Sequence, residues 1–203
     1  MPDASRATLR AEQVAQTRAA LVTAARHLFG SKGFATTSVE DIVREARVTT
    51  GALYHHFSTK TAIFEAVFQQ VHADMLVASA HAAGSATDPV EALLAGFGAF
   101  LDSVMEPEVQ RIVITDAPAV LGMSRYIELD EGPALDSVVA ALRAATDSGM
   151  LHVADPPTLA RLLFGALTRA GLLIASAADP KATRDAVAGT LRAMLARFAM
   201  SGD

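Results

Sequence analysis

The fold is decided by residues 36–60, TTSVEDIVREARVTTGALYHHFSTK, which hold two short helix patterns separated by a three-residue turn. Ser38 is placed to cap the first helix, and Asp41, three residues later, can complete a capping box with it. Val39, Ile42 and Val43 then recur at helical spacing and give this helix an apolar stripe. The first half of the segment therefore predicts a short amphipathic helix.

A second short helix follows almost at once. Thr49 can cap it, residues 50–56 form it, and Leu53 and Phe57 lie four residues apart on its apolar face. Two such helices are too small to build a core alone, and their close spacing is typical of a helix-turn-helix.

The polar face of the second helix has the chemistry of a DNA contact. Small residues at its start allow close approach to a groove floor, while hydroxyls and an imidazole can bond base edges or phosphate oxygens. Lys60 opens a further helix, whose N-terminal amides and dipole favour a phosphate. The candidate DNA contacts are Thr37, Ser38, Arg47, Thr49, Thr50, Gly51, Ala52, Tyr54, His55 and Lys60.

This segment resembles the DNA-binding domain of the TetR family of bacterial transcriptional regulators. The resemblance rests on Leu28-Phe29 and Gly33-Phe34 in the leading helix, Thr37-Ser38-Val39, the run GALYHHF at 51–57, and Lys60 three residues after that Phe. One departure is Arg47, where the family more often has Gly. If the turn needs a left-handed backbone there, Arg costs about 1 kcal/mol relative to Gly, and a contact with phosphate is one way to offset that cost.

Composition fits a helical protein of one large or two small domains. The chain has 203 residues, of which 51% are hydrophobic, and it has no Cys, which excludes a disulfide scaffold. The longest apolar stretches, such as 171–178, are too short to span a membrane. Residues 1–16 are polar and carry no hydrophobic signal region, so we expect a flexible arm and a soluble cytoplasmic protein with no membrane partner.

Charge is distributed unevenly along the chain. The formal net charge is -5, but residues 1–60 carry eight Lys or Arg against five acids, and the remainder carries nine against seventeen. Residues 1–60 have a net charge of +3 and the remainder has a net charge of -8. A polyanion such as DNA would attract the first segment and repel the second. This asymmetry alone is only suggestive, because an excess of three charges can arise by chance.

Past residue 60 the pattern is helical, and Asp-Pro pairs at 88–89, 155–156 and 179–180 mark helix starts. The predicted helices are 59–83, 89–104, 107–115, 118–129, 133–148, 158–177 and 180–199. We expect an all-α protein with a flexible arm at 1–16, a helix-turn-helix domain at 17–60, and a larger helical domain at 61–203. The helix at 60–83 is expected to join the two domains mechanically.

The last predicted helix carries a broad apolar stripe, and the helix at 158–177 carries more apolar residues than a single covered face requires. The residue pattern alone leaves open whether these stripes face the protomer's own core. The resemblance implies that both helices pair across a two-fold axis in a homodimer. The candidate interface residues are Leu163, Leu167, Ala170, Val187, Leu191, Met194, Leu195 and Phe198.

An apolar cavity is expected in the middle of the chain, because the family senses small molecules in this domain. Met and aromatic side chains repack around varied ligands, and one hydroxyl can orient them. The candidate residues are Phe97, Phe100, Leu101, Met105, Met123, Tyr126 and Phe164. The alternative for each of them is an ordinary place in the core.

Signals for catalysis or metal binding are weak. His72 and His81 are nine residues apart, which puts them on opposite faces of a helix. Glu128, Asp130 and Glu131 cluster in a predicted loop, where an acidic surface is the default interpretation. No phosphate-binding or dinucleotide-binding motif occurs. We therefore expect no enzyme, no cofactor and no metal.

The sequence thus predicts a homodimeric, one-component transcriptional regulator. Its expected partners are a palindromic duplex DNA operator and a small apolar or amphipathic effector, and its expected action is repression that ends when the effector binds. Three alternatives stay open: a helical small-molecule-binding protein without useful DNA affinity, an activator, and an enzyme on a helical scaffold.

Overall fold

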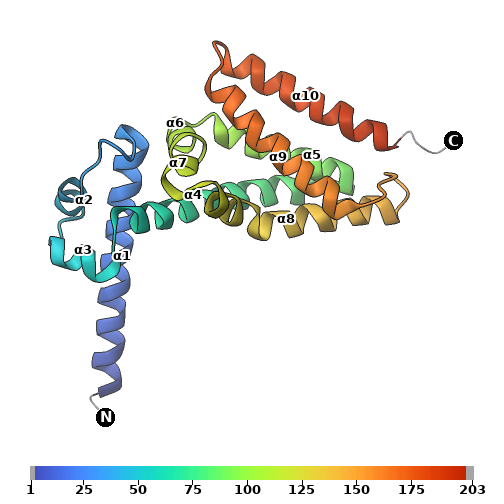
Figure 1. Ribbon diagram of the computed structural model, residues 1–203. Coiled ribbons are helices and arrows are strands. Elements are labelled where there is room, and N and C mark those ends of the chain that lie inside the picture. The colour runs from blue at the N-terminus through green and yellow to red at the C-terminus, as the bar shows by residue number, and fades with distance from the viewer. Residues whose placement is uncertain (1–2, 200–203) are drawn as a thin grey trace. The chain divides into compact units, whose positions relative to one another are not determined.

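The computed structural model describes residues 3–199, with the backbone alone for residues 3–9 and 133. Residues 1–2 of the predicted arm and residues 200–203 of the predicted second domain lie outside the described residues. Every regular element in residues 3–199 is a helix, which confirms the all-α prediction (Figure 1). The chain divides into two compact units, Met1–Gln70 and Val71–Asp203.

Unit 1 is built from α1 (Asp3–Lys32), α2 (Val39–Ala46), α3 (Thr50–His56) and the start of α4 (Lys60–Gly84). Both α2 and α3 pack on α1. The core holds three aromatic rings in mutual contact, with centroids 5.6 Å apart for Phe29 and Phe34, and 5.2 Å for Phe34 and Phe64. This cluster fixes the loop that leads into α2 against the two long helices.

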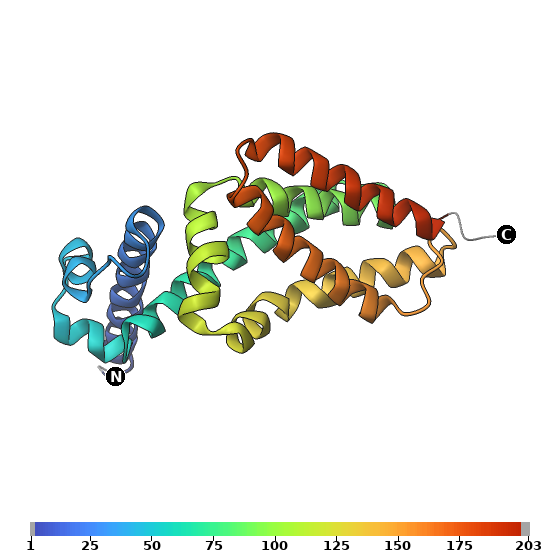
Figure 2. The same ribbon diagram turned by 45° about the horizontal axis from the view of Figure 1, so that its top comes forward.

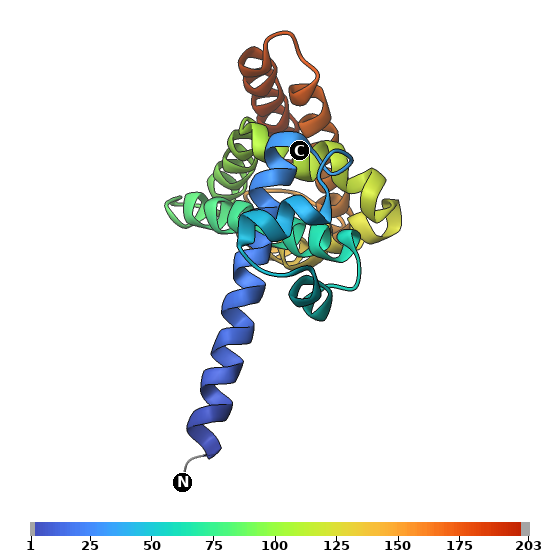
Figure 3. The same cartoon turned by 90° about the vertical axis from the view of Figure 1, so that its left-hand side faces the viewer.

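The segment predicted as a flexible arm is helical in the structure. Helix α1 begins at Asp3, and its N-terminal half extends away from α2 and α3 (Figure 3). Residues 10–16 are exposed, so packing does not hold this half in place. Ala, Arg, Leu, Glu and Gln dominate residues 7–16, and their high intrinsic helix propensity explains how the helix continues without a core contact.

The boundary between the units lies inside α4, ten residues after the predicted one. The reason is that the first turns of α4 belong to the core of unit 1. Ile63, Phe64 and Val67 are fully buried, and the Phe64 ring centroid lies 5.3 Å from that of Phe29. The helix at 59–83 was otherwise predicted within one residue at each end.

Unit 2 contains the rest of α4 and a group of packed helices. They are α5 (Pro89–Val104), α6 (Pro107–Val109), the π-helix η1 (Gln110–Asp116), α7 (Ala117–Leu121), α8 (Met123–Asp147), α9 (Pro156–Ala175) and α10 (Pro180–Ala199). Helix α9 contacts α5, α8, α10 and η1, and α5 contacts α8 and α10 (Figure 2). The predicted Asp caps are present: Asp88 accepts the backbone N–H groups of Val90 and Glu91, and Asp155 accepts that of Thr158.

Two glycines change the predicted helix pattern between residues 117 and 148. Gly122 has φ 78°, and it separates α7 from α8 inside the stretch predicted as one helix, 118–129. Gly132 has non-helical angles, and it kinks α8 where a break between two helices was predicted. The predicted helix at 107–115 is divided between α6 and η1.

Helix α9 crosses the unit at close range to η1. A Cβ atom on Gly171 would lie 2.8 Å from Cδ1 of Ile114, so the absent side chain allows the approach. By length and composition α9 is also apolar enough to cross a membrane, contrary to the sequence expectation. In the structure, 33% of this apolar stretch is buried inside the protein, and Leu163, Leu167 and Ile174 are among its buried residues.

Candidate DNA interface and interior cavity

The helix-turn-helix starts with the predicted capping box. Ser38 Oγ accepts a hydrogen bond from the backbone N–H of Asp41 at 3.1 Å, and an Asp41 carboxylate oxygen accepts one from the N–H of Ser38 at 3.4 Å. These hydrogen bonds lower the pKa of Asp41, with nearby Lys32 and Arg44 acting in the same direction. The carboxylate at the N-terminus of α2 therefore stays ionised and complements the helix dipole.

Arg47 ends α2 in the left-handed conformation, with φ 56° and ψ 40°. Its backbone N–H donates to the carbonyls of Arg44 and Val43, which closes the last turn. It is the one non-glycine residue with positive φ among the described residues, and its side chain is exposed. The turn therefore has the left-handed backbone on which the expected cost of Arg relative to Gly depends, and the Arg47 side chain is open to solvent on this side of the motif.

Helix α3 presents the face expected of a recognition helix. Thr49 Oγ1 accepts the N–H of Ala52 at 3.1 Å, and Leu53 is fully buried under the helix. Tyr54 is 53% exposed. The other predicted contacts on and beside this helix are exposed (Thr49, Thr50, Gly51 and His55) or half-buried (Ser38 and Ala52). The sequence therefore places small and hydroxyl side chains on the accessible side of α3, as close approach to a groove requires.

Two predicted DNA contacts have structural roles instead. Thr37 is 1% exposed, and its hydroxyl donates to the Gly33 carbonyl at 2.8 Å. Lys60 Nζ donates to the carbonyls of Phe34 at 2.8 Å and Thr37 at 2.9 Å, and lies 4.1 Å from the centroid of the Phe34 ring. The ammonium thus locks the loop between α1 and α2. The sequence did not reveal this, because the acceptors are backbone groups far away in the chain.

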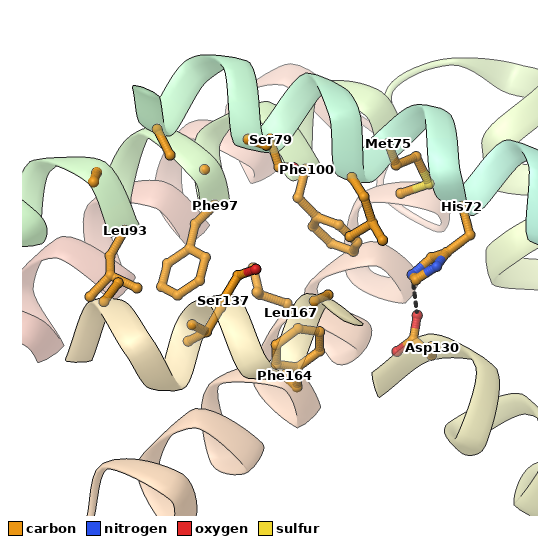
Figure 4. A pocket seen from close by; sticks show the side chains of 18 of the residues that line it. His72, Met75, Ser79, Leu93, Phe97, Phe100, Asp130, Ser137, Phe164 and Leu167 are labelled. Carbon is orange, nitrogen blue, oxygen red and sulfur yellow. Dashed lines mark ion pairs between the residues drawn. The ribbon is translucent and has the colours of Figure 1, made fainter. Parts of the chain in front are cut away.

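A cavity of about 270 Å³ lies inside unit 2, between α4, α5, α8 and α9 (Figure 4). Its wall is mostly apolar, and three of the seven predicted side chains line it: Phe97, Phe100 and Phe164. The other principal lining residues are His72, Met75 and Ser79 of α4, Leu93 of α5, Asp130 and Ser137 of α8, and Leu167 and Thr168 of α9.

Four predicted cavity residues lie elsewhere. Leu101 is fully buried and lines a smaller cavity between α5 and α10. Met105 ends α5 and does not reach the wall, while Met123 is 59% exposed at the start of α8. Tyr126 is buried but lies outside the cavity wall. The aromatic and Met residues therefore lie in the unit that contains the cavity. Which of them line the cavity depends on the direction in which each helix presents its side chains.

The cavity has one polar end, which the sequence analysis missed. His72 Nε2 lies 3.4 Å from Asp130 Oδ1, and Thr168 Oγ1 lies 3.4 Å from Asp130 Oδ2. Figure 4 shows this pair at one end of the cavity, with Leu93 and Phe97 toward the other. Burial, and then the Asp130 charge, raise the pKa of Tyr126, so the phenol stays neutral beside this cluster.

Asp130 corrects the interpretation of the acidic cluster at residues 128–131 as a surface feature. Asp130 is 8% exposed and faces the cavity, whereas Glu128 is largely exposed. His72 could have been recognised from its spacing, since it falls in the buried stripe of Phe68, Val71 and Met75. Among the described residues, no three His, Asp or Glu side chains gather as metal ligands would.

The predicted dimer residues mostly serve the protomer itself. Leu163, Leu167, Ala170, Leu191 and Leu195 are buried within the chain, Val187 and Phe198 are half-buried, and only Met194 is exposed, at 44%. A different face of α9 stays open, with Leu162 67% exposed and Leu173 44% exposed. The predicted apolar stripes are present on α9 and α10, but most of their residues face the interior of the protomer.

A capped helix-turn-helix followed by a helical unit with an interior cavity defines the class of one-component DNA-binding regulators. Comparison with known proteins agrees with this class. Residues 21–67 match the family described as bacterial regulatory proteins, tetR family, and residues 90–198 match the tetracyclin repressor-like C-terminal domain. The chain belongs to the TetR family of transcriptional regulators, and it is a DNA-binding regulator.

Individual relatives extend the match over most of the chain. A crystal structure of a TetR-family regulator from Pectobacterium atrosepticum superposes with a TM-score of 0.80 and 32% identity, covering 94% of this chain and 97% of that one. The Tn10 TetC protein of Escherichia coli is 28% identical over 154 residues, 76% of this chain and 78% of that protein. The regulator TtgR of Pseudomonas putida is 38% identical over 61 residues, 30% of this chain and 29% of that one. TetR-family regulators are soluble proteins that bind operator DNA as dimers.

Proposed function

We propose that this regulator is a homodimeric cytoplasmic repressor that leaves a palindromic operator when a small, mostly apolar molecule enters the cavity of unit 2. One observation carries the proposal: α4 belongs to both units. Its first turns lie in the core of unit 1 through Ile63, Phe64 and Val67, and residues 72–83 of the same helix form a wall of the cavity.

The continuity of α4 supplies the coupling between cavity and DNA. A ligand that displaces the wall of α4 moves the helix whose start is packed under the helix-turn-helix. Two recognition helices must match successive major grooves about 34 Å apart, so a small tilt is enough to weaken binding. Moving the population from 99% competent to 1% needs about 10⁴-fold preference for the released form, or about 5.5 kcal/mol, which two ligands per dimer supply at under about 3 kcal/mol each.

The proposed DNA contacts are the predicted residues that are exposed or half-buried in unit 1. Thr49, Thr50, Gly51 and Ala52 of the α3 start lie nearest the bases, and Ser38, Arg47, Tyr54 and His55 position the motif on phosphate. Thr37 and Lys60 support the motif from inside. This division follows from exposure and hydrogen bonding in unit 1.

The proposed dimer contact is the open face of α9 and α10 rather than their buried stripes. On α9 this face carries Leu162, Gly165 and Leu173, and on α10 it carries Met194. Small residues beside large apolar ones allow two helices from each protomer to pack closely in a four-helix bundle. The two copies share one self-complementary patch, as a two-fold interface requires.

The test is binding of the full chain to the DNA upstream of its own gene, followed by fluorescence anisotropy with and without candidate effectors. We expect specific binding that falls as salt rises and that a mostly apolar effector abolishes. Binding of effectors without any affinity for such DNA would favour a helical small-molecule-binding protein. Effector-strengthened binding would favour an activator.

A further inference from the structure

We infer that the cavity recognises a small neutral molecule with one hydroxyl group, held between His72 and Asp130, with its apolar body against the phenylalanine wall. This inference rests on the proposed function, because it names the chemical class of the effector. It is carried by the polar end of the cavity, which contains its only ionisable lining side chains among the described residues.

The His72–Asp130 pair is close but poorly bonded. Its nitrogen-to-oxygen distance is 3.4 Å, whereas charge-assisted hydrogen bonds of this kind measure about 2.7–2.9 Å. The second carboxylate oxygen of Asp130 has an equally long contact, 3.4 Å from Thr168 Oγ1, and that hydroxyl lies nearer to the Phe164 carbonyl, at 3.1 Å. A buried carboxylate with two long contacts has unused capacity to accept a hydrogen bond.

A hydroxyl group fits this end better than either charged alternative. It donates its proton to Asp130 and accepts from the Nε2–H of His72, so it bonds both side chains at once. A carboxylate would bond His72 alone and meet the Asp130 charge in a low-dielectric space. An ammonium would bond Asp130 alone and leave the imidazole N–H facing a cation.

The volume limits the rest of the molecule. About 270 Å³ lies just below the usual range of about 300–1,000 Å³ for ligand pockets. Phe97, Phe100 and Phe164 line the apolar part, where a single ring with a short alkyl chain can stack.

Three probes of one shape test the head-group preference: para-propylphenol, para-propylbenzoate and para-propylbenzylamine. Near pH 7 they are neutral, anionic and cationic respectively. Their dissociation constants for the unaltered full-length dimer are measured by calorimetry and checked by the rise in Tm. We expect the phenol to bind at least about tenfold more tightly than either charged probe.

Variants locate the effect in the side-chain pair. Asp130→Asn should weaken phenol binding by about tenfold and bring the benzoate closer to it, and Glu128→Gln is the matched control, an exposed acid two residues away that should change nothing beyond about twofold. Equal binding of a charged probe, or no binding of the phenol at millimolar concentration, would overturn the inference. The comparison of probes on the unaltered chain stands even if Asp130→Asn does not fold.

Operator release separates this inference from the proposed function. If the phenol binds through Asp130 but leaves operator affinity unchanged, the release function fails and the head-group assignment stands. If instead the benzoate releases the operator while the phenol does not, release stands and the head-group assignment fails.

Discussion

At the scale of single residues, this chain combines unusual strain at one position with a cation used internally at another. Arg47 adopts the left-handed conformation that usually belongs to Gly, and Lys60 bonds two carbonyls of a loop that precedes it by more than twenty residues. The sequence predicts a phosphate contact for Lys60 and leaves the role of Arg47 open. In the structure the Lys60 ammonium bonds backbone carbonyls, while the Arg47 side chain is exposed.

Arg47→Gly should raise the free energy of unfolding by about 1 kcal/mol, because glycine adopts positive φ without strain. Arg44→Gly is the matched control, since Arg44 lies in the last turn of α2 in helical conformation, where the same substitution should lower it by about 1 kcal/mol. Urea denaturation measures both. Changes of the same sign in the two variants would contradict the assigned backbone strain.

Lys60→Ala should lower the free energy of unfolding by about 2 kcal/mol, because two part-buried carbonyls lose a charged donor. Lys32→Ala, an exposed lysine 3.7 Å from Asp41, should stay within about 0.5 kcal/mol. The salt dependence of operator binding distinguishes the remaining alternative. A slope of log affinity against log salt that flattens by about 2 units per dimer, with stability unchanged, would return Lys60 to the phosphate contacts.

At the scale of elements, α9 carries exposed apolar side chains opposite its buried stripe, and α10 carries one, Met194. The inner faces hold Leu163, Leu167, Leu191 and Leu195, and the outer faces hold Leu162 and Met194. A helix that is apolar on more than one side is one that meets more than one neighbour. The outer faces are therefore available to a second copy.

Leu191→Asp and Met194→Asp should have different effects, because one residue faces the protomer core and the other faces outward. Leu191 is 4% exposed, so a carboxylate there should destabilise the protomer by several kcal/mol and lower its Tm. Met194 is 44% exposed, so its replacement should leave each protomer helical but shift sedimentation from dimer to monomer, with loss of operator affinity. An intact, DNA-binding Met194→Asp dimer would place the interface elsewhere.

At the scale of the whole molecule, α4 is the element through which an occupied cavity can change DNA binding. The cavity wall on α4 begins at His72, two residues after unit 1 ends at Gln70. A ligand bound to His72 therefore acts on the first turn of α4 beyond the boundary. Through this coupling, a substitution in the cavity wall can change effector sensitivity although the substituted residue does not contact DNA.

Phe100→Trp should weaken binding of the effector by about tenfold or more, because the larger ring occupies part of the cavity. The effector is the one identified by its release of the operator. Ligand-free operator affinity should stay within about threefold. Met123→Trp is the control, because Met123 is 59% exposed and does not line the cavity. The measurement is operator affinity by fluorescence anisotropy across an effector titration. If Phe100→Trp lowers operator affinity without effector as much as it lowers effector binding, Phe100 is a core residue rather than a sensor.

The sequence by itself determined the local features of this protein. Caps, turn and helix starts at Ser38, Arg47, Asp88 and Asp155 depend on hydrogen bonds within a few residues, so their patterns can be interpreted without a fold. The family resemblance follows from the same short-range motifs. Apolar stripes were also visible, since they need only helical periodicity.

Only the tertiary structure decided which neighbour each side chain meets. His72, Asp130 and Thr168 come from three helices, and no spacing along the chain brings a histidine of α4 to a carboxylate of α8. Lys60 reaches carbonyls of a remote loop, and Leu191 faces inward while Met194 faces outward. Periodicity fixes the face of a helix, but the packing of the other helices determines whether that face meets the core, a cavity or solvent.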